Sequence, residues 1–174
     1  GRARLTPAVV NLHDLIERAL AASRAGDAGR GPVLLRDIPA EHLMLITDPD
    51  RLLQVLINVL ANARKYCDAP APEIRIETRR LRDGRIEIDI ADNGAGIPPE
   101  HEALIFEKFA RLDDPARAGG AGLGLAICRE IMQFLGGSIA YLPGQGGAAF
   151  RISLPPRPPA RTGAAGENAA NAAG

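Results

Sequence analysis

Two asparagines and a lysine share the polar side of one strongly patterned segment, residues 50–67. Asn58 and Asn62 are four residues apart and Lys65 follows three residues later, so on a helix of about 100° per residue the three side chains form one narrow stripe. Asparagine is unfavourable in the middle of a helix because its side chain competes for backbone hydrogen bonds. Two of them on one face indicate either a bound ligand or a core helix with a hydrated seam.

A second polar cluster follows an alternating apolar segment, in the sequence Asp-Asn-Gly-Ala-Gly-Ile of residues 92–97. A carboxylate at the end of a strand can accept a hydrogen bond from an amino group, and the two glycines would let the backbone approach a flat ligand closely. An Asp-Asn-Gly sequence is also an ordinary turn, because Asp and Asn cap turns with their own side chains. This stretch alone leaves both interpretations open.

Glycines at positions 119, 120, 122 and 124 immediately precede a helical pattern. Glycines at a helix N-terminus leave N–H groups exposed at the positive end of the helix dipole, an arrangement that suits phosphate. The spacing is GxGxG and no strand precedes it, so it is not the dinucleotide-binding fingerprint. The absence of a GxxxxGK[ST] sequence likewise excludes a P-loop.

Hydrophobic periodicity predicts the elements that must position these stretches. The predicted strands are residues 8–10, 33–35, 43–46, 74–78, 86–90, 138–142 and 149–154, and the predicted helices are residues 11–22, 50–67 and 126–134. Asp48 is the predicted N-cap of the central helix, with Pro49 at its first position. Two consecutive glycines, Gly136 and Gly137, are predicted to end the last helix.

The connections between these elements are rich in turn residues. A Pro-Ala-Glu turn at 39–41 separates two short buried strands, and an Arg-Asp-Gly turn at 82–84 joins two strands that each have one polar face. Residues 92–122 are rich in Gly, Pro and Asp, and so long an irregular stretch in a compact domain is more often a functional lid than a passive connection. From residue 155 onward the composition predicts a disordered tail.

Composition excludes several classes of protein. The 174 residues suit one domain, and 21 Lys+Arg against 21 Asp+Glu imply no surface that seeks polyanions. The two cysteines lie far apart, which predicts reduced thiols in a cytosolic setting, and the three histidines show no ligand spacing. No tryptophan is present, which argues against stacking on single-stranded nucleic acid. No apolar run reaches 18 residues and no signal peptide opens the chain.

Taken together and in this order, the stretches resemble the sequence boxes of the catalytic, ATP-binding domain of sensor histidine kinases, in the GHKL (Bergerat-fold) ATPase superfamily. The N box would be residues 58–66, the first glycine box 92–97, the F box 106–111 and the second glycine box 120–125. The resemblance runs from about residue 8 to residue 154.

This resemblance implies a two-layer α/β sandwich with a mixed, mostly antiparallel sheet, helices on one face and ATP under a mobile lid at about residues 97–121. The catalytic ATP-binding domain would be residues 1–155, and the disordered tail residues 156–174. The dimerisation and phosphoacceptor domain and the sensor domain are expected outside this chain.

Carried over residue by residue, the resemblance implies that Asn62 coordinates Mg²⁺ through its side-chain oxygen and that Asn58 lines the same groove. Lys65 would reach the phosphates, and Tyr66 would lie against the adenine ring. Asp92 would accept a hydrogen bond from the adenine amino group and so select adenine over guanine. The expected cofactors are therefore ATP and Mg²⁺.

The same resemblance implies roles in the lid and the second glycine box. Phe106 and Phe109 would anchor the lid, and Arg111, with Arg117 as a further candidate, would meet the γ-phosphate. Lys65 and Arg111 are thus the expected catalytic residues. The remaining nucleotide-binding positions would be Gly94, Gly96, Ile97, Phe109, Gly120, Gly122, Leu123, Gly124 and Leu125.

One position separates the branches of this superfamily. Gyrase-type, mismatch-repair and chaperone ATPases resemble one another in a glutamate one turn before the metal asparagine, where this chain has Asn58. A general base must lie within hydrogen-bond reach of its proton, so the chain looks poorly equipped for hydrolysis. Transfer to a histidine needs mainly positioning and charge neutralisation, since imidazole is itself the nucleophile. The resemblance therefore implies γ-phosphoryl transfer to a histidine, for relay to a response-regulator aspartate in two-component signalling.

The phosphoacceptor itself is not expected in this chain. His13-Asp14 lacks the rest of an H box, so His13 is predicted to lie on a helix surface. The expected partners are the protein's own histidine-bearing dimerisation domain and a cognate response regulator, with no nucleic acid. The fragment is expected to be a monomer, and the full-length protein a homodimer anchored in the bacterial inner membrane, with this domain in the cytoplasm. The alternatives are an ATPase or serine-kinase regulator on the same fold, and a degenerate nucleotide-binding module.

Overall fold

The computed structural model describes residues 4–24, 33–37, 43–107 and 122–160, and these residues contain one five-stranded sheet and one two-stranded ribbon. The sheet has the order β2 (Val33–Asp37), β4 (Glu73–Arg80), β5 (Ile86–Asp92), β7 (Ala149–Leu154), β6 (Ser138–Tyr141). Strand β2 runs parallel to β4 and every other pair is antiparallel. In the ribbon, β1 (Ala8–Asn11) pairs antiparallel with β3 (Met44–Thr47).

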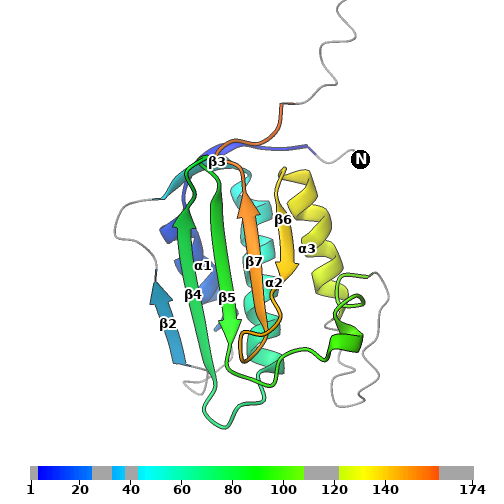
Figure 1. Ribbon diagram of the computed structural model, residues 1–174. Coiled ribbons are helices and arrows are strands. Elements are labelled where there is room, and N and C mark those ends of the chain that lie inside the picture. The colour runs from blue at the N-terminus through cyan, green and yellow to red at the C-terminus, as the bar shows by residue number, and fades with distance from the viewer. Residues whose placement is uncertain (1–3, 25–32, 38–42, 108–121, 161–174) are drawn as a thin grey trace, which may run out of the picture.

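Three α-helices of the described chain lie behind the sheet and cover one of its faces (Figure 1). They are α1 (Leu12–Ser23), α2 (Pro49–Tyr66) and α3 (Gly122–Phe134). A short 3₁₀ helix, η1 (Pro99–His101), follows the sheet strand β5. The predicted sandwich, a mixed and mostly antiparallel sheet with helices on one face, is therefore confirmed.

Helices α1 and α2 begin where the sequence predicts because their first N–H groups find side-chain acceptors, whereas α3 begins at Gly122, four residues before its predicted start. Asp48 caps α2: its Oδ1 accepts from the Arg51 backbone N–H at 3.4 Å, and Pro49 occupies the first helical position. The other carboxylate oxygen of Asp48 accepts from the Thr6 N–H at 3.0 Å, which ties the N-terminal segment to the start of α2. Asn11 caps α1 in the same way. His13 is exposed on α1, as predicted.

The central strands alternate between a buried and a charged face. The inward side chains of β4 and β5 are isoleucines and Thr78; among the isoleucines, Ile76 and Ile90 are the most exposed at 1%. They pack against the leucines of α2, including Leu52, Leu56 and Leu60. The register pairs Arg80 with Ile86, so the predicted 82–84 turn connects this hairpin. Burial of one face of each strand fixes that register, since a slip of one residue would turn every isoleucine to water.

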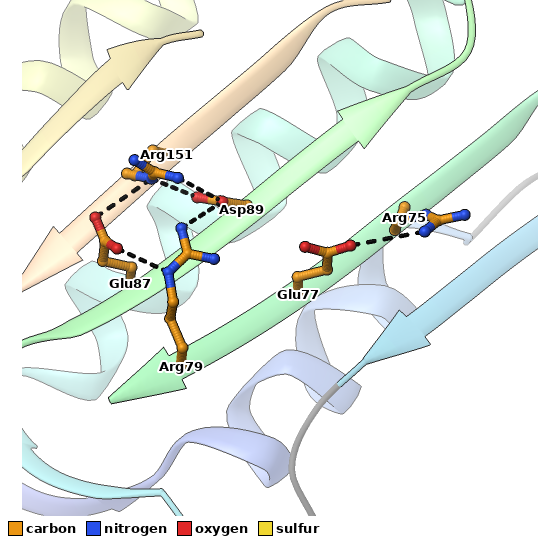
Figure 2. Close-up of polar contacts among 6 residues, drawn as sticks. All are labelled: Arg75, Glu77, Arg79, Glu87, Asp89 and Arg151. Carbon is orange, nitrogen blue, oxygen red and sulfur yellow. Dashed lines mark hydrogen bonds and ion pairs between the residues drawn. The ribbon is translucent and has the colours of Figure 1, made fainter. Parts of the chain in front are cut away.

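The outer face of the sheet is held by ion pairs that cross three strands (Figure 2). Arg79 on β4 bonds Glu87 and Asp89 on β5, each at 2.8 Å. Arg151 on β7 donates to both oxygens of Asp89, at 2.9 and 3.0 Å. The charged face predicted for the hairpin is therefore a connected network of charges lying opposite the helices.

Two parts of the fold differ from what the sequence suggested. The short strands on either side of the 39–41 turn belong to different sheets, β2 to the five-stranded sheet and β3 to the ribbon; the turn itself lies outside the described residues. The first residues of the predicted disordered tail, 156–160, are part of the described structure, and the Pro156 carbonyl accepts from the Ile46 N–H at 3.0 Å. The prediction for 161–174 falls outside the described residues. Among the described helices, none is long and apolar enough to cross a membrane.

Candidate functional site

The predicted nucleotide-binding boxes meet at one end of the molecule. In Figure 1 the C-terminal end of α2, the C-terminal end of β5, the segment after it and the first turn of α3 all lie at the lower end. This follows from topology, because α2 and β5 run in the same direction while α3 starts beside their ends. The asparagine-bearing helix and Asp92 are therefore brought together although 30 residues separate positions 62 and 92.

Asn62 on α2 is partly buried and is incompletely bonded. Its Nδ2 atom is buried and has no hydrogen-bond partner among the described residues. Buried polar atoms are normally paired, and leaving one unpaired costs about 1–3 kcal/mol. The amide can present either its oxygen or its nitrogen by rotating about its last bond. Asn62 is thus available to a ligand or ion, because the described residues do not satisfy its amide nitrogen.

Asn58, one turn earlier on α2, contacts a residue of α3. It shares a hydrogen bond with the thiol of Cys128, which is fully buried and also donates to the Val55 carbonyl at 3.9 Å. Burial raises the pKa of Cys128 to about 11, against the lowering effect of the Asn58 hydrogen bond, so the thiol stays protonated at neutral pH. Sequence reasoning missed Cys128, because nothing in the spacing of α3 marks it as a partner of α2.

The last turn of α2 carries two further predicted residues. Lys65 is exposed, and its positive charge lies at the negative end of the helix dipole. Tyr66 is the last residue of the helix, and its side chain lies outside the described structure.

Asp92, the last residue of β5, is fixed on one side and open on the other. Its Oδ1 accepts from the backbone N–H groups of Gly94 at 2.8 Å and Ala148 at 3.2 Å. No described residue donates to its Oδ2. Burial raises the pKa of the Asp92 carboxyl, the two backbone bonds lower it, and the nearby charge of Asp68 raises it further, so that the net shift is upward.

Backbone conformation and close packing also require glycine at positions in the first glycine box. Gly96 has φ +79°, the left-handed region that other residues rarely adopt. A Cβ at Gly94 would lie 2.8 Å from the Asp68 carboxylate and 3.1 Å from that of Asp92. Gly147, which the sequence analysis did not single out, passes so close to Asp92 that a Cβ there would overlap its carbonyl. These glycines allow the chain to fold tightly around the Asp92 carboxylate.

The first half of the predicted lid packs on the sheet. The Ile97 N–H donates to the Tyr141 hydroxyl at 3.2 Å. The ring of Phe106 meets Phe150 edge to face with 6.2 Å between centroids, and Phe150 in turn contacts Tyr141 at 5.6 Å. Phe106 therefore anchors this half of the segment through ring contacts, in the way its F-box position suggested.

Several predicted positions in the second half of the expected lid and in the second glycine box fall outside the described residues. Phe109, Arg111, Arg117 and Gly120 lie outside the described residues. For Gly122, Leu123 and Gly124 the structure describes only the backbone, as the first turn of α3. The side chain of Leu125 is buried in the hydrophobic core.

A groove of about 380 Å³ opens on the opposite side, across the charged outer face of β4 and β5. Asp92 and Asn93 line one end of it, but the described polar residues of α2 do not. Its walls carry both signs of charge, from residues such as Arg75, Glu77 and Asp89. The groove is therefore mainly a feature of the outer sheet face and includes only Asp92 and Asn93 of the predicted boxes.

Comparison with known proteins identifies the family. The family model described as histidine kinase-, DNA gyrase B- and HSP90-like ATPase matches residues 47–158. The chain belongs to this ATPase family. It is 43% identical over 119 residues to sensor protein KdpD of Escherichia coli (strain K12), an alignment that covers 68% of this chain and 13% of KdpD.

Solved structures agree on the branch of this ATPase family. The catalytic domain of the histidine kinase ThkA superposes with a TM-score of 0.76 at 26% identity, covering 88% of this chain and 99% of that one. Full-length ShkA in complex with AMPPNP gives a TM-score of 0.73 at 26% identity, covering 92% of this chain and 33% of that one. This chain is thus an ATP-binding catalytic domain of the sensor histidine kinase type. It spans 13% of KdpD and a third of ShkA.

Proposed function

We propose that this domain binds Mg·ATP and donates the γ-phosphoryl group to a histidine on a helical dimerisation domain, for relay to a response-regulator aspartate. The observation that carries the proposal is that α2, with Asn62, and β5, with Asp92, end on the same side of the molecule (Figure 1), and that each of these residues has a polar atom with no partner among the described residues. One is suited to the phosphate end of a nucleotide and the other to a base with an amino group. The similarity to ShkA, whose full-length structure is a complex with AMPPNP, supports nucleotide binding by this domain.

The chemistry of α2 fits an Mg²⁺ ion held mainly by the nucleotide. Mg²⁺ prefers oxygen ligands, keeps several of its waters and often takes only one or two ligands from the protein. The incompletely bonded amide of Asn62 can supply one neutral oxygen. When bound, the ion would neutralise charge on the phosphates, while Asn62 holds it and Lys65 approaches the same end of the helix.

The same helix supports phosphoryl transfer over hydrolysis. Its polar stripe consists of Arg51, Gln54, Asn58, Asn62 and Lys65, with no carboxylate among them. Asn58 is in addition bonded to Cys128, and an amide cannot take up a proton from water. With no general base on this stripe, water is a poor nucleophile beside α2, whereas an incoming imidazole needs no activation.

Calorimetry of ATP binding with and without Mg²⁺ is the first test. We expect Mg·ATP to bind the wild-type chain, and Asp92→Ala to weaken ATP by roughly 10- to 100-fold, because the base loses a buried acceptor worth about 1–3 kcal/mol. Asn62→Ala should remove mainly the difference between the Mg²⁺ and Mg²⁺-free titrations. A folded wild-type chain that binds no nucleotide would overturn the proposal and leave the degenerate-module alternative.

Transfer is tested by adding a purified histidine-bearing helical domain of a sensor kinase in trans with ATP labelled at the γ-phosphate. We expect label on the histidine of the added domain and slow phosphate release without it. Steady release of phosphate by the chain alone would favour the ATPase alternative. Replacement of the acceptor histidine by glutamine is the control, and it should abolish labelling without changing ATP binding.

The assembly follows from the same proposal. The partners are the histidine-bearing domain and a response regulator, and this domain alone is a monomer, with dimerisation and any membrane anchor located in other parts of the protein. Light scattering on the isolated chain tests the first point. A concentration-independent dimer would contradict it.

A further inference from the structure

Two side chains next to the proposed site link the end of α2 to the loop that carries Asp92. The first is Asn93, which directly follows Asp92. Its Oδ1 accepts from the Glu73 N–H at 2.8 Å and from the Cys67 thiol at 3.3 Å, and its Nδ2 donates to the Ala71 carbonyl at 2.9 Å. One side chain thus binds the connection between α2 and β4 at three points.

The second link runs in the opposite direction. Asp68, two residues beyond the end of α2, accepts from the Ala95 N–H at 2.9 Å. Its carboxylate and that of Asp92 both lie close to Gly94, at 2.8 and 3.1 Å from where a Cβ of that residue would be. The connection after α2 is therefore hydrogen-bonded to the 92–96 loop in two places. One bond set comes from the side chain of Asn93, and the other from that of Asp68.

These links do more than hold two strands together. The β4–β5 ladder already pairs Ile74 with Asp92, so the strand end is in place without either side chain. Asn93 and Asp68 are both exposed, and neither belongs to the hydrophobic core. Asp68 also adds a negative charge close to Asp92, which an arrangement serving stability alone would avoid. What the links fix is the position of the loop relative to the end of α2.

We propose that Asn93 and Asp68 are positioning residues for the nucleotide. They hold the Asp92 carboxylate at a set distance and angle from the α2 residues Asn62 and Lys65. The base and the phosphates of one ligand must reach both places at once, so a shift of the loop would spoil the hydrogen bond that distinguishes adenine from guanine. This inference rests on the proposed function and assigns the accuracy of base selection to these two links.

The ratio of the dissociation constants for GTP and ATP measures this role, because a loss of stability alone would leave it unchanged in the folded protein. Asn93→Ala removes all three bonds of that side chain, and we expect the ratio to fall by about tenfold, mainly through weaker ATP binding. Asp68→Ala should lower the ratio by a smaller factor. Asp68→Asn keeps an oxygen for the Ala95 N–H and should restore most of it.

Two further measurements separate positioning from general damage. Asp83→Ala removes a comparable cap on a backbone N–H, that of Arg85 at 3.0 Å, but in the turn at the other end of β5; it should leave the ratio unchanged. In an Asp92→Ala background, Asn93→Ala should change the ratio no further, since the carboxylate that it positions is gone.

Failure of this inference is distinguishable from failure of the proposed function. If the wild-type chain does not bind Mg·ATP, the proposed function fails first. If it binds but Asn93→Ala weakens ATP and GTP equally, or changes only the melting temperature, the positioning role is overturned. Should Asn93→Ala fail to fold by circular dichroism, the comparison of Asp68→Ala with Asp68→Asn decides: equal ratios would contradict the role, and recovery in the asparagine variant would support it.

Discussion

Two aspartates on one strand show how strongly the surroundings of a single residue set its chemistry. Asp89 and Asp92 lie three residues apart on β5. Burial would raise the pKa of Asp89, but hydrogen bonds from Arg151 and Arg79 outweigh it and lower that pKa. Asp92 has no cationic partner in the described structure, and burial raises its pKa. The Asp89 carboxylate is engaged by arginines of the sheet, whereas the Asp92 carboxylate remains available to a ligand.

These directions predict opposite titrations. Carbon-13 chemical shifts of the side-chain carboxyls should give Asp89 a titration midpoint below, and Asp92 a midpoint above, the ordinary pKa of an aspartate side chain. Since the pKa of Asp89 is depressed by folding, its stabilising effect is present above the ordinary Asp pKa and is lost as pH falls through the folded value. Folding raises the pKa of Asp92. Its contribution to stability is therefore present below the ordinary Asp pKa and is lost as pH rises through the folded value. Coincident midpoints for the two residues would contradict the prediction.

Thr78 is a second residue whose surroundings conflict with its chemistry. Its side chain faces the core from β4, and its hydroxyl is buried without a hydrogen-bond partner. Because valine has almost the same shape and no polar atom, Thr78→Val should raise the free energy of unfolding by about 1 kcal/mol. Urea denaturation followed by circular dichroism measures this. Thr6→Val at an exposed position is the matched control, and an equal gain there would refute the explanation.

At the scale of elements, the two halves of the site are joined by loops and not by the helices themselves. Strand β6 holds the start of the lid, because the Tyr141 hydroxyl accepts from the Ile97 N–H. The ring of Tyr141 also packs against Phe150, which in turn contacts Phe106. The segment predicted to form the lid therefore begins at a residue that is hydrogen-bonded to the sheet.

Tyr141→Phe tests this link, because it removes the hydroxyl and keeps the ring contacts. We expect amide hydrogen exchange at Ile97 to become about 2- to 10-fold faster, the equivalent of one ordinary hydrogen bond. The Leu142 amide, which donates to the Ala149 carbonyl at 2.8 Å, is the internal control and should not change. Unchanged exchange at Ile97 would show that Tyr141 does not hold the lid.

At the scale of the whole molecule, residues 156–160 pack across the end of the fold that lies far from the site. Beyond the last strand, Pro156 accepts from Ile46 on β3 and packs against Gly84, while Pro159 packs against Gly136. These contacts join the ribbon, the β4–β5 turn and the end of α3, three regions distant in sequence. Residues 156–160 are therefore a strap across the upper end of the domain in Figure 1.

Truncation separates this strap from the rest of the tail. Ending the chain after Leu154 should lower the free energy of unfolding by about 1–2 kcal/mol. The truncated chain loses the hydrogen bond from the Ile46 N–H to the Pro156 carbonyl and the packing contacts of the prolines. Ending it after Ala160 should have little effect if residues 161–174 form the predicted disordered tail. Chemical denaturation of both forms measures the difference, and equal stabilities would refute the strap. ATP affinity should stay the same in both, because the site lies at the other end.

The sequence by itself determined the elements and the residue types of the site. Helix starts at Asn11 and Asp48, and the alternation from Ile74 to Ile90, could be predicted because caps and periodicities act between residues no more than four apart. The boxes on α2 and after β5 are contiguous runs, so they too could be read directly, and with them the ATPase family.

Tertiary structure alone decided which of those residues meet. Val33 and Met44 begin strands that look alike in sequence yet join different sheets. Several contacts at the site join side chains to partners many residues away in the sequence. Asn58 contacts Cys128, and Asn93 and Asp68 each bond the backbone of the other's loop. Such contacts depend on the packing of the whole chain, and no local rule selects them, because each asparagine has the same local preferences wherever the fold places it.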